Sequence, residues 1–309
     1  MAKARDLFFG LFAAALAGAA IAAPPAKTPT KAPPPTPTPP LADILRDSPA
    51  TDWRRIEQSR MLYMQTPKGR VLIELDPTFA PNHFDNIRAL IRAGFFDRAS
   101  IGRVQDNFVV QWGIPDGQDA PLGQARKKLE PEFTRAAKGL AFIRLPDRDS
   151  YAAETGWVDG FPAARDLKTG RAWLTHCYGT VAVARDTPAN SGNGGALYAV
   201  IGPARNLDRN LTVVGRVVEG MPLLSSLPRG DNAMGFYAKP TDILPIKIRF
   251  GTDVPAAEQT ELEALRTDSK TFATVVEARR NRRDDFYTVP AGGVDVCNVP
   301  LPVRPAAKR

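Results

Sequence analysis

Residues 207–221 read LDRNLTVVGRVVEGM, and this stretch predicts a β-strand that is entered through a turn. Turn-forming residues fill its first part, and a valine-rich run follows from Thr212 to Val218. Many short strands with few helices predict a mainly β domain, either a barrel or a sandwich. Similar short runs recur on both sides of this stretch, at residues 70–75, 101–104, 108–111, 139–144, 179–184, 196–201 and 246–250.

One helix is expected inside this β-rich region. Pro81 suits its first turn, and Gly94 suits its end. Between them, Phe84, Ile87 and Ile91 would share one face of the helix. We therefore expect that face to pack on the β-structure.

Two further segments fall outside the strand pattern. Residues 146–172 have no clear period, and we expect a long loop insertion there. Residues 252–309 form a C-terminal extension, in which Pro255 begins a helical pattern that includes Val275. We expect this helical extension to pack against the β-structure through Leu262, Leu265, Phe272 and Val276.

The N-terminus has the pattern of an export signal. Lys3 and Arg5 precede an apolar stretch at 7–20, and small residues follow at 20–22. Because a membrane-spanning helix needs ~20 apolar residues, we expect residues 1–22 to be a cleaved signal peptide, with an uncleaved anchor as the alternative. Residues 23–40 are rich in proline and predict an extended linker. The expected location is therefore the periplasm.

Export bears on the two cysteines, Cys177 and Cys297. In an oxidising compartment such a pair can form a disulfide. The alternative is two separate buried thiols that behave as small hydrophobic side chains. The sequence alone favours neither reading.

Composition excludes several classes of function. The net charge is +8, but no basic stripe with interleaved aromatic residues appears, so no nucleic-acid partner is expected. His83 and His176 are the two histidines of the chain, which excludes a multi-histidine metal site, and we expect both to be structural. No phosphate-binding loop of known spacing is present, and neither a metal nor another cofactor is expected.

Three segments together resemble the cyclophilins. They are IGRV at 101–104 with FVVQ at 108–111, NSGNGGALY at 190–198, and the stretch at 207–221. The family carries, in the same order, Phe-His-Arg-Val with Phe-Val-x-Gln-Gly-Gly-Asp, Asn-Ser-x-x-Ser-Gln-Phe-Phe-Ile, and Leu-Asp-x-x-x-Thr-Val-Phe-Gly-x-Val-x-x-Gly-Met. The resemblance covers about 61–125 and 172–250. It implies a closed eight-stranded antiparallel β-barrel capped by two helices, which we place at 41–251.

The resemblance also implies peptidyl-prolyl cis-trans isomerase activity on proline-containing polypeptides, by a monomer. The amide before proline crosses a barrier of ~18–20 kcal/mol because twisting breaks its resonance. Catalysis needs an apolar pocket for the proline ring and donors that favour the twisted amide. Arg103 supplies a rigid fork of donors, and Gln111 would hold the adjacent backbone or orient Arg103. The candidates for substrate binding are Phe108, Val109, Tyr198, Ala184, Leu207 and Leu211.

Several positions depart from the family pattern. Gly102 stands where the family has histidine, Gly195 begins the segment that replaces Ser-Gln-Phe-Phe, and Leu211 stands where His or Tyr is usual. Asn206 occupies the place of the tryptophan of cyclosporin-sensitive members, so we expect weak cyclosporin binding. Without the family pattern, Arg103 would be read as a surface residue paired with Asp106. These departures keep open a second function, a catalytically weak module that binds clients or partners in the cell envelope.

Overall fold

The computed structural model describes residues 38–307 except 116 and 288, and these residues form one compact unit. The expected signal peptide and nearly all of the expected linker lie outside the described residues. Within the described part of the chain, no helix has the length and apolar character that would let it cross a bilayer.

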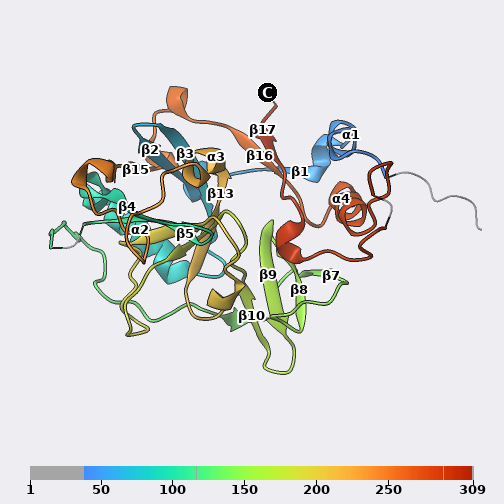
Figure 1. Ribbon diagram of the computed structural model, residues 1–309, viewed down its shortest axis with the longest axis horizontal. Coiled ribbons are helices and arrows are strands. Elements are labelled where there is room, and N and C mark those ends of the chain that lie inside the picture. Colours follow the sequence, from blue (N-terminus) through green and yellow to red (C-terminus); the bar gives the residue numbers. More distant parts are fainter. Residues whose placement is uncertain (1–37, 116, 288, 308–309) are drawn as a thin grey trace, which may run out of the picture. The chain divides into compact units, whose positions relative to one another are not determined.

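An antiparallel sheet of nine strands forms the expected barrel (Figure 1), in the order β14-β4-β5-β12-β11-β13-β3-β2-β15. Ile246 alone separates β14, which pairs with β4, from β15, which pairs with β2. One chain segment therefore closes both edges, and the barrel has eight strands when β14 and β15 are counted as one. The bounds are β2 (Met61–Thr66), β3 (Gly69–Leu75), β4 (Ser100–Gln105), β5 (Val109–Gly113), β11 (Thr180–Val183), β12 (Leu197–Val200), β13 (Val213–Glu219), β14 (Leu244–Pro245) and β15 (Lys247–Phe250).

Two helices pack on this barrel, as expected. Helix α2 (Pro81–Arg92) begins at Pro81, and Gly94 follows its end in the left-handed conformation. Its side chains Phe84 and Ile87 join the barrel core, and the short helix α3 (Met221–Ser225) adds Leu224. The inward-facing positions of the strands fill the rest of this core.

The segment expected to be a loop at 146–172 is instead part of a second antiparallel sheet, so that expectation is wrong. We call this second sheet the inserted sheet. Its strand order is β6-β10-β9-β8-β7. Of the run expected as a strand at 139–144, only 143–144 are strand residues, and they belong to β7 of this sheet and not to the barrel. Hairpin β8–β9 turns through Asp159 and Gly160, which both have positive φ. An Asp-Gly pair is a strong hairpin signal, because both residues accept this backbone. The bounds are β6 (Arg135–Ala136), β7 (Ile143–Leu145), β8 (Glu154–Val158), β9 (Phe161–Asp166) and β10 (Arg171–Leu174).

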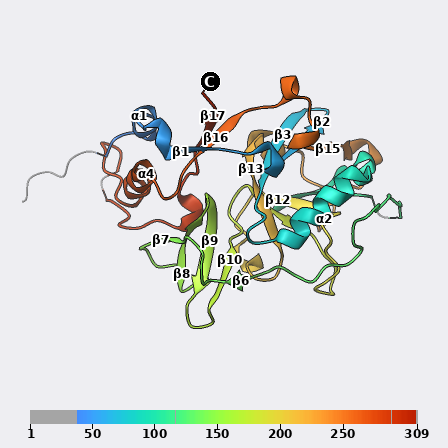
Figure 2. The ribbon, with the colours of Figure 1, turned by 180° about the vertical axis from the view of Figure 1, so that it is seen from behind.

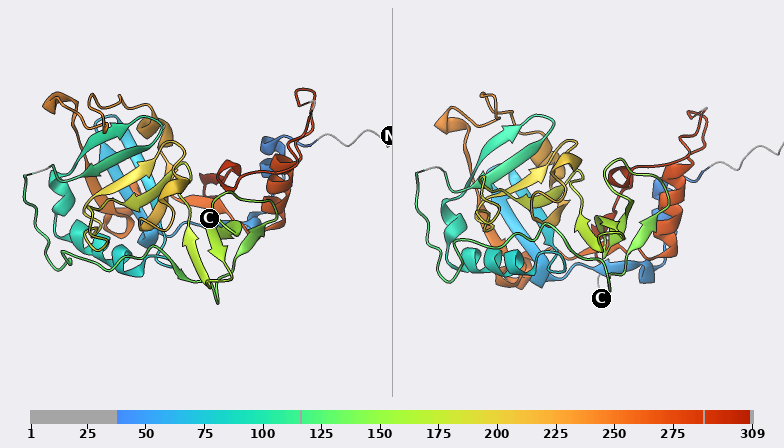
Figure 3. Two further views of the ribbon diagram at one scale, coloured as in Figure 1. Left: turned by 60° about the horizontal axis from the view of Figure 1, so that its bottom comes forward. Right: turned by 90° about the horizontal axis from the view of Figure 1, so that it is seen from below.

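The C-terminal extension combines strands with one helix. Pro255 precedes a single 3₁₀ turn, Ala256–Glu258, and not the expected longer helix. Next, β16 (Leu262–Leu265) pairs with β1 (Trp53–Arg55) and with β17 (Val303–Pro305). Leu262 and Leu265 are therefore strand residues. Helix α4 (Lys270–Arg280) starts later, where the Ser269 side chain accepts a hydrogen bond from the Phe272 N–H. It lies beside α1 (Leu41–Arg46), as Figures 2 and 3 show.

Packing of the extension differs from the expectation in its partners. Leu262 packs on the outer side of β2 and β3. Leu265, Phe272 and Val276 pack instead with Trp53 and with Trp157 of the second sheet. We call residues 41–55, 135–174 and 262–305 the accessory lobe. A disulfide joins Cys177, just before β11, to Cys297 in this lobe.

Candidate active site

A β-bulge determines where Arg103 points. Ile101 pairs with Trp112, but Arg103 pairs with Gln111, so Gly102 is an extra residue in β4. Ile101 and Val104 both face the barrel core. Because successive strand residues alternate between faces, Arg103 would point inward without the extra residue. The glycine at this position, a departure from the family pattern, thus lies at the bulge that directs Arg103 outward.

The pairing between neighbouring strands places further side chains on the outer face beside Arg103, and these form a row. Gln111 of β5 pairs with Tyr198 of β12, and Tyr198 pairs with Ala182 of β11. Residues directly opposite each other in an antiparallel pair lie on the same face of the sheet. Arg103, Gln111 and Tyr198 therefore lie side by side on the outer face of three neighbouring strands.

Hydrogen bonds fix the Arg103 guanidinium in this row. It donates to Gln111 Oε1 at 2.9 Å, to the Met234 carbonyl at 2.7 Å and to the Gln105 side chain. Since a guanidinium has five N–H donors, two remain for a ligand. Burial lowers the pKa of Arg103, but arginine remains protonated. Asp106 pairs with Arg229 instead, at 2.8 Å, so the reading of Arg103 as its surface partner is wrong.

Two aromatic rings flank the guanidinium. The Arg103 Cζ lies 5.9 Å from the centroid of Phe108 and 5.3 Å from that of Phe236. Phe236 is 41% exposed. The backbone N–H of the adjacent Tyr237 donates a hydrogen bond to the Gly102 carbonyl at 3.0 Å, which holds this segment against β4. Sequence reasoning missed Phe236, since no pattern in the sequence indicates that this segment returns to β4.

A groove of about 400 Å³ opens beside this row. Arg103, Gln111 and the candidate Ala184 line it, and Phe236 forms part of its apolar wall. The groove also includes polar residues, among them Asn193. The groove therefore offers both apolar contact and hydrogen bonds to an extended peptide.

The substrate-binding candidates converge on one apolar cluster on the outer face of the barrel. Val109 and Tyr198 are 2% and 3% exposed and lie within the cluster. Four candidates are partly buried against it and offer surface to a ligand, namely Phe108, Ala184, Leu207 and Leu211. The second sheet contributes Phe161 and Leu174 to the same cluster. The inserted sheet thus covers one side of the cluster.

Both histidines are buried and hydrogen-bonded. His83 contacts Glu132 at 2.6 Å through Nδ1 and the Gly192 carbonyl at 3.2 Å through Nε2. His176 contacts Asp208 and the Tyr198 hydroxyl, each at 3.0 Å. Between residues 38 and 307, apart from the two gaps, no three side chains of metal-ligand type gather into a site.

A closed antiparallel barrel with an arginine and a glutamine beside a groove on its outer wall, next to an apolar cluster, points to a proline-directed isomerase. The family model "Cyclophilin type peptidyl-prolyl cis-trans isomerase/CLD" matches residues 61–248. The chain belongs to this family, and its activity is isomerisation of the peptide bond before proline.

Relatives extend the similarity beyond the barrel. A "Probable peptidyl-prolyl cis-trans isomerase" of Brucella suis is 26% identical over 185 residues, which cover 60% of this chain and 80% of the relative. The peptidyl-prolyl cis-trans isomerase CYP23 of Arabidopsis thaliana is 26% identical over 230 residues, 74% of this chain and 86% of that protein. The crystal structure of cyclophilin AquaCyp293 from Hirschia baltica covers 83% of this chain and 95% of its own, with 25% identity and a TM-score of 0.64. That share exceeds the range of the barrel, so the similarity reaches into the accessory lobe.

Proposed function

We propose that this chain accelerates isomerisation of X-Pro bonds in exported proteins as they fold, and that Arg103 is the residue that favours the twisted amide. The observation that carries this proposal is the fixed guanidinium with two unused donors beside a groove. As the amide twists, its nitrogen gains a lone pair and its carbonyl loses conjugation. Donors placed in advance stabilise that state more than the planar one.

Gln111 has a separate task in this proposal. Its Oε1 accepts from Arg103, which leaves the side-chain amide N–H groups to hold the peptide backbone. Phe108 contacts both the guanidinium and the apolar cluster. A proline ring on Phe108, Leu207 and Leu211 would thus present its preceding amide to Arg103. Lowering the barrier by about 7 kcal/mol would accelerate exchange by roughly five decades.

Export and the periplasm remain part of the proposal. The N-terminal pattern at 1–22 supports them. The disulfide between Cys177 and Cys297 agrees with an oxidising compartment, because such bonds are rare in reducing ones. Clients are proline-containing polypeptides, and the enzyme acts as a monomer. Weak cyclosporin binding is also part of the proposal. An exposed asparagine, Asn206, stands at the position of the family's tryptophan, so an inhibitor that contacts this position meets no indole ring.

A second candidate function is client binding with little turnover. Met234 and Phe236 are 55% and 41% exposed beside Arg103 and favour apolar contact with a polypeptide. In this reading the groove retains a client, and the guanidinium contributes affinity but no rate.

A protease-coupled isomerisation assay separates the two functions. The Arg103→Ala variant should lose at least about a hundredfold in kcat/KM, because a positioned donor at the reacting amide is removed. Arg249→Ala is the matched control, since Arg249 of β15 forms an exposed ion pair with Glu258. It should keep wild-type activity, and both variants should keep the wild-type melting temperature. If the wild type and Arg103→Ala both leave the reaction at its uncatalysed rate, the client-binding reading holds.

A further inference from the structure

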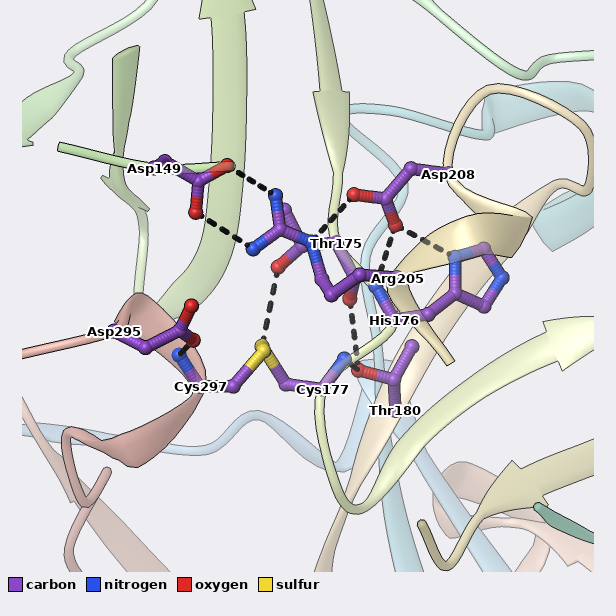
Figure 4. The surroundings of a disulfide bond; sticks show 9 residues. All are labelled: Asp149, Thr175, His176, Cys177, Thr180, Arg205, Asp208, Asp295 and Cys297. Carbon is purple, nitrogen blue, oxygen red and sulfur yellow. Dashed lines mark hydrogen bonds and ion pairs between the residues drawn. A yellow bond between two sulfur atoms is a disulfide. The ribbon is translucent and has the colours of Figure 1, made fainter. Parts of the chain in front are cut away.

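Tyr198 is connected to the accessory lobe by a continuous chain of buried polar side chains. Its hydroxyl contacts His176 Nε2 at 3.0 Å, and His176 Nδ1 contacts Asp208 Oδ1 at 3.0 Å. Asp208 Oδ2 accepts from Arg205 Nε at 2.6 Å. Arg205 then binds both oxygens of Asp149 at 3.0 Å each. We call these five residues the Tyr198 relay. Figure 4 shows Arg205 between Asp149 and Asp208, with His176 on the other side of Asp208.

The charge of Asp208 fixes the direction of the hydrogen bonds that it receives. Burial alone would raise the pKa of Asp208, but the hydrogen bonds from His176 and the charge of Arg205 hold that pKa below its ordinary value. Asp208 is therefore a carboxylate that only accepts, and His176 Nδ1 carries the proton between them. Burial raises the pKa of the Tyr198 hydroxyl, so this hydroxyl stays protonated in its contact with His176 Nε2. Each inner member, His176, Asp208 and Arg205, thus has one relay partner on each side.

The two ends of the relay lie in different parts of the molecule. Tyr198 lies in the row with Gln111, within the apolar cluster that supports Phe108. Asp149 belongs to the connection between β7 and β8 of the accessory lobe, and its side chain is 2% exposed. Arg205 also begins the short turn that ends at Leu207, a further candidate for substrate binding. Asp149 is therefore connected to two parts of the site.

We propose that the accessory lobe positions the proline pocket through the Tyr198 relay, with Asp149, Arg205, Asp208 and His176 as positioning residues. This inference rests on the proposed function. Without its hydroxyl partner the Tyr198 ring would keep its burial but lose the bond that fixes its orientation in the apolar cluster. The inserted sheet then serves the reaction directly, in addition to covering the apolar cluster.

Two aspartates on the same connection provide a matched test. Asp149→Asn weakens the link to Arg205, whereas Asp147→Asn weakens a comparable link in which Arg280 binds both oxygens of Asp147 at 2.8 Å. Asp147 lies outside the relay. We expect Asp149→Asn to lower kcat/KM about tenfold and Asp147→Asn less than twofold, because misplaced binding groups reduce rate steeply. Equal effects of the two substitutions would overturn the inference.

Tyr198→Phe tests the route of the coupling, since it keeps the ring and removes the hydroxyl. It should cause a loss similar to that of Asp149→Asn. The double variant should lose no more than the larger single loss, because both changes break the same chain. If the two losses multiply, the residues act independently and the relay does not carry the effect. Melting temperatures of all variants identify any loss that comes from unfolding.

The two histidines provide a readout besides activity. In protein labelled with ¹⁵N-histidine, the ring signals of His176 should change in Asp149→Asn and in Tyr198→Phe. The signals of His83, which binds Glu132 and Gly192, should stay unchanged. An inactive wild type with an intact His176 response would refute the proposed function, and the positioning role with it. An active wild type in which Asp149→Asn leaves both His176 and kcat/KM unchanged would refute the relay alone.

Discussion

At the scale of single residues, the candidate site depends on one inserted glycine and on the partners of one guanidinium. Gly102 shifts the register of β4 by one residue and so brings Arg103 to the outer face beside Gln111. A second feature at this scale, the burial of a carboxyl group at Asp76, destabilises the fold. Asp76 follows β3, is 1% exposed, and has one carboxylate oxygen without a partner among the described residues.

Asp76 leads to a prediction about pH. Burial raises the pKa of Asp76 from 3.8 to about 6. Because the folded state holds the proton more tightly than the unfolded state, the free energy of unfolding falls as pH rises from about 4 to about 6. Above that range, the ionised carboxylate costs the fold about 3 kcal/mol. Asp76→Asn should therefore be more stabilising, relative to wild type, at pH 7 than at pH 4.

Urea unfolding of wild type and Asp76→Asn at a series of pH values measures this difference. The other carboxylates are common to both proteins, so their contributions cancel in the comparison. A difference between the two proteins that is the same at pH 4 and at pH 7 would show that Asp76 does not titrate in this range.

At the scale of elements, the inserted sheet depends on close backbone contacts. A Cβ added to Gly156 of β8 would lie 2.0 Å from the Ile143 carbonyl oxygen of β7, whereas one added to Gly102 would have no atom within 4 Å. Both glycines lie in strands and lack the positive φ that would itself strain a side chain. The two glycines therefore differ in the free space around an added Cβ and not in backbone conformation.

Gly156→Ala should consequently separate β7 from β8 and lower the free energy of unfolding by about 2 kcal/mol or more, as overpacking in a well-packed region does. Gly102→Ala should change it by less than about 0.5 kcal/mol, as substitutions without a steric conflict usually do. Thermal and urea unfolding of the two variants provide the comparison. Similar losses in both would mean that the clash at Gly156 is relieved by backbone movement.

Elements also show how far the sequence could predict the structure. Apart from β2 and β14, the barrel strands and α2 follow from their patterns, and the family motifs bring Arg103 and Gln111 to one place. In the inserted sheet, the Asp159-Gly160 turn and part of β7 were predictable. The other strands were not, because they are short and their residues do not alternate between buried and exposed. Phe236 reaches Arg103, and Asp149 reaches Arg205, from segments far away in the chain, and nothing in their local sequence encodes that approach. Leu262 and Leu265 are three apart, a spacing that a short strand and a helix can both show.

At the scale of the whole molecule, the disulfide links the barrel to the accessory lobe. Cys177 and Cys297 are 120 residues apart, and Cys177 directly follows His176 of the relay. A bond that closes so long a loop restricts the unfolded chain and should contribute about 2–5 kcal/mol. Replacing both cysteines by serine should lower the free energy of unfolding by that amount.

Unfolding with and without a reductant provides the measurement and its control. The reductant should destabilise the wild type and leave the double serine variant unchanged. Equal stability of the reduced and oxidised wild type would show that the other contacts of the lobe hold Cys297 in place by themselves.

Closure of the barrel by a single late segment has a consequence for synthesis. Until residues 244–250 have emerged, the outer edges of β2 and β4 are both unpaired, and exposed strand edges invite association with other chains. The partner of β1 arrives later still, at 262–265. A nascent or truncated chain that stops before this point therefore exposes unpaired strand edges. During synthesis, a protein that assists the folding of others thus passes through a stage in which it can itself associate with other chains.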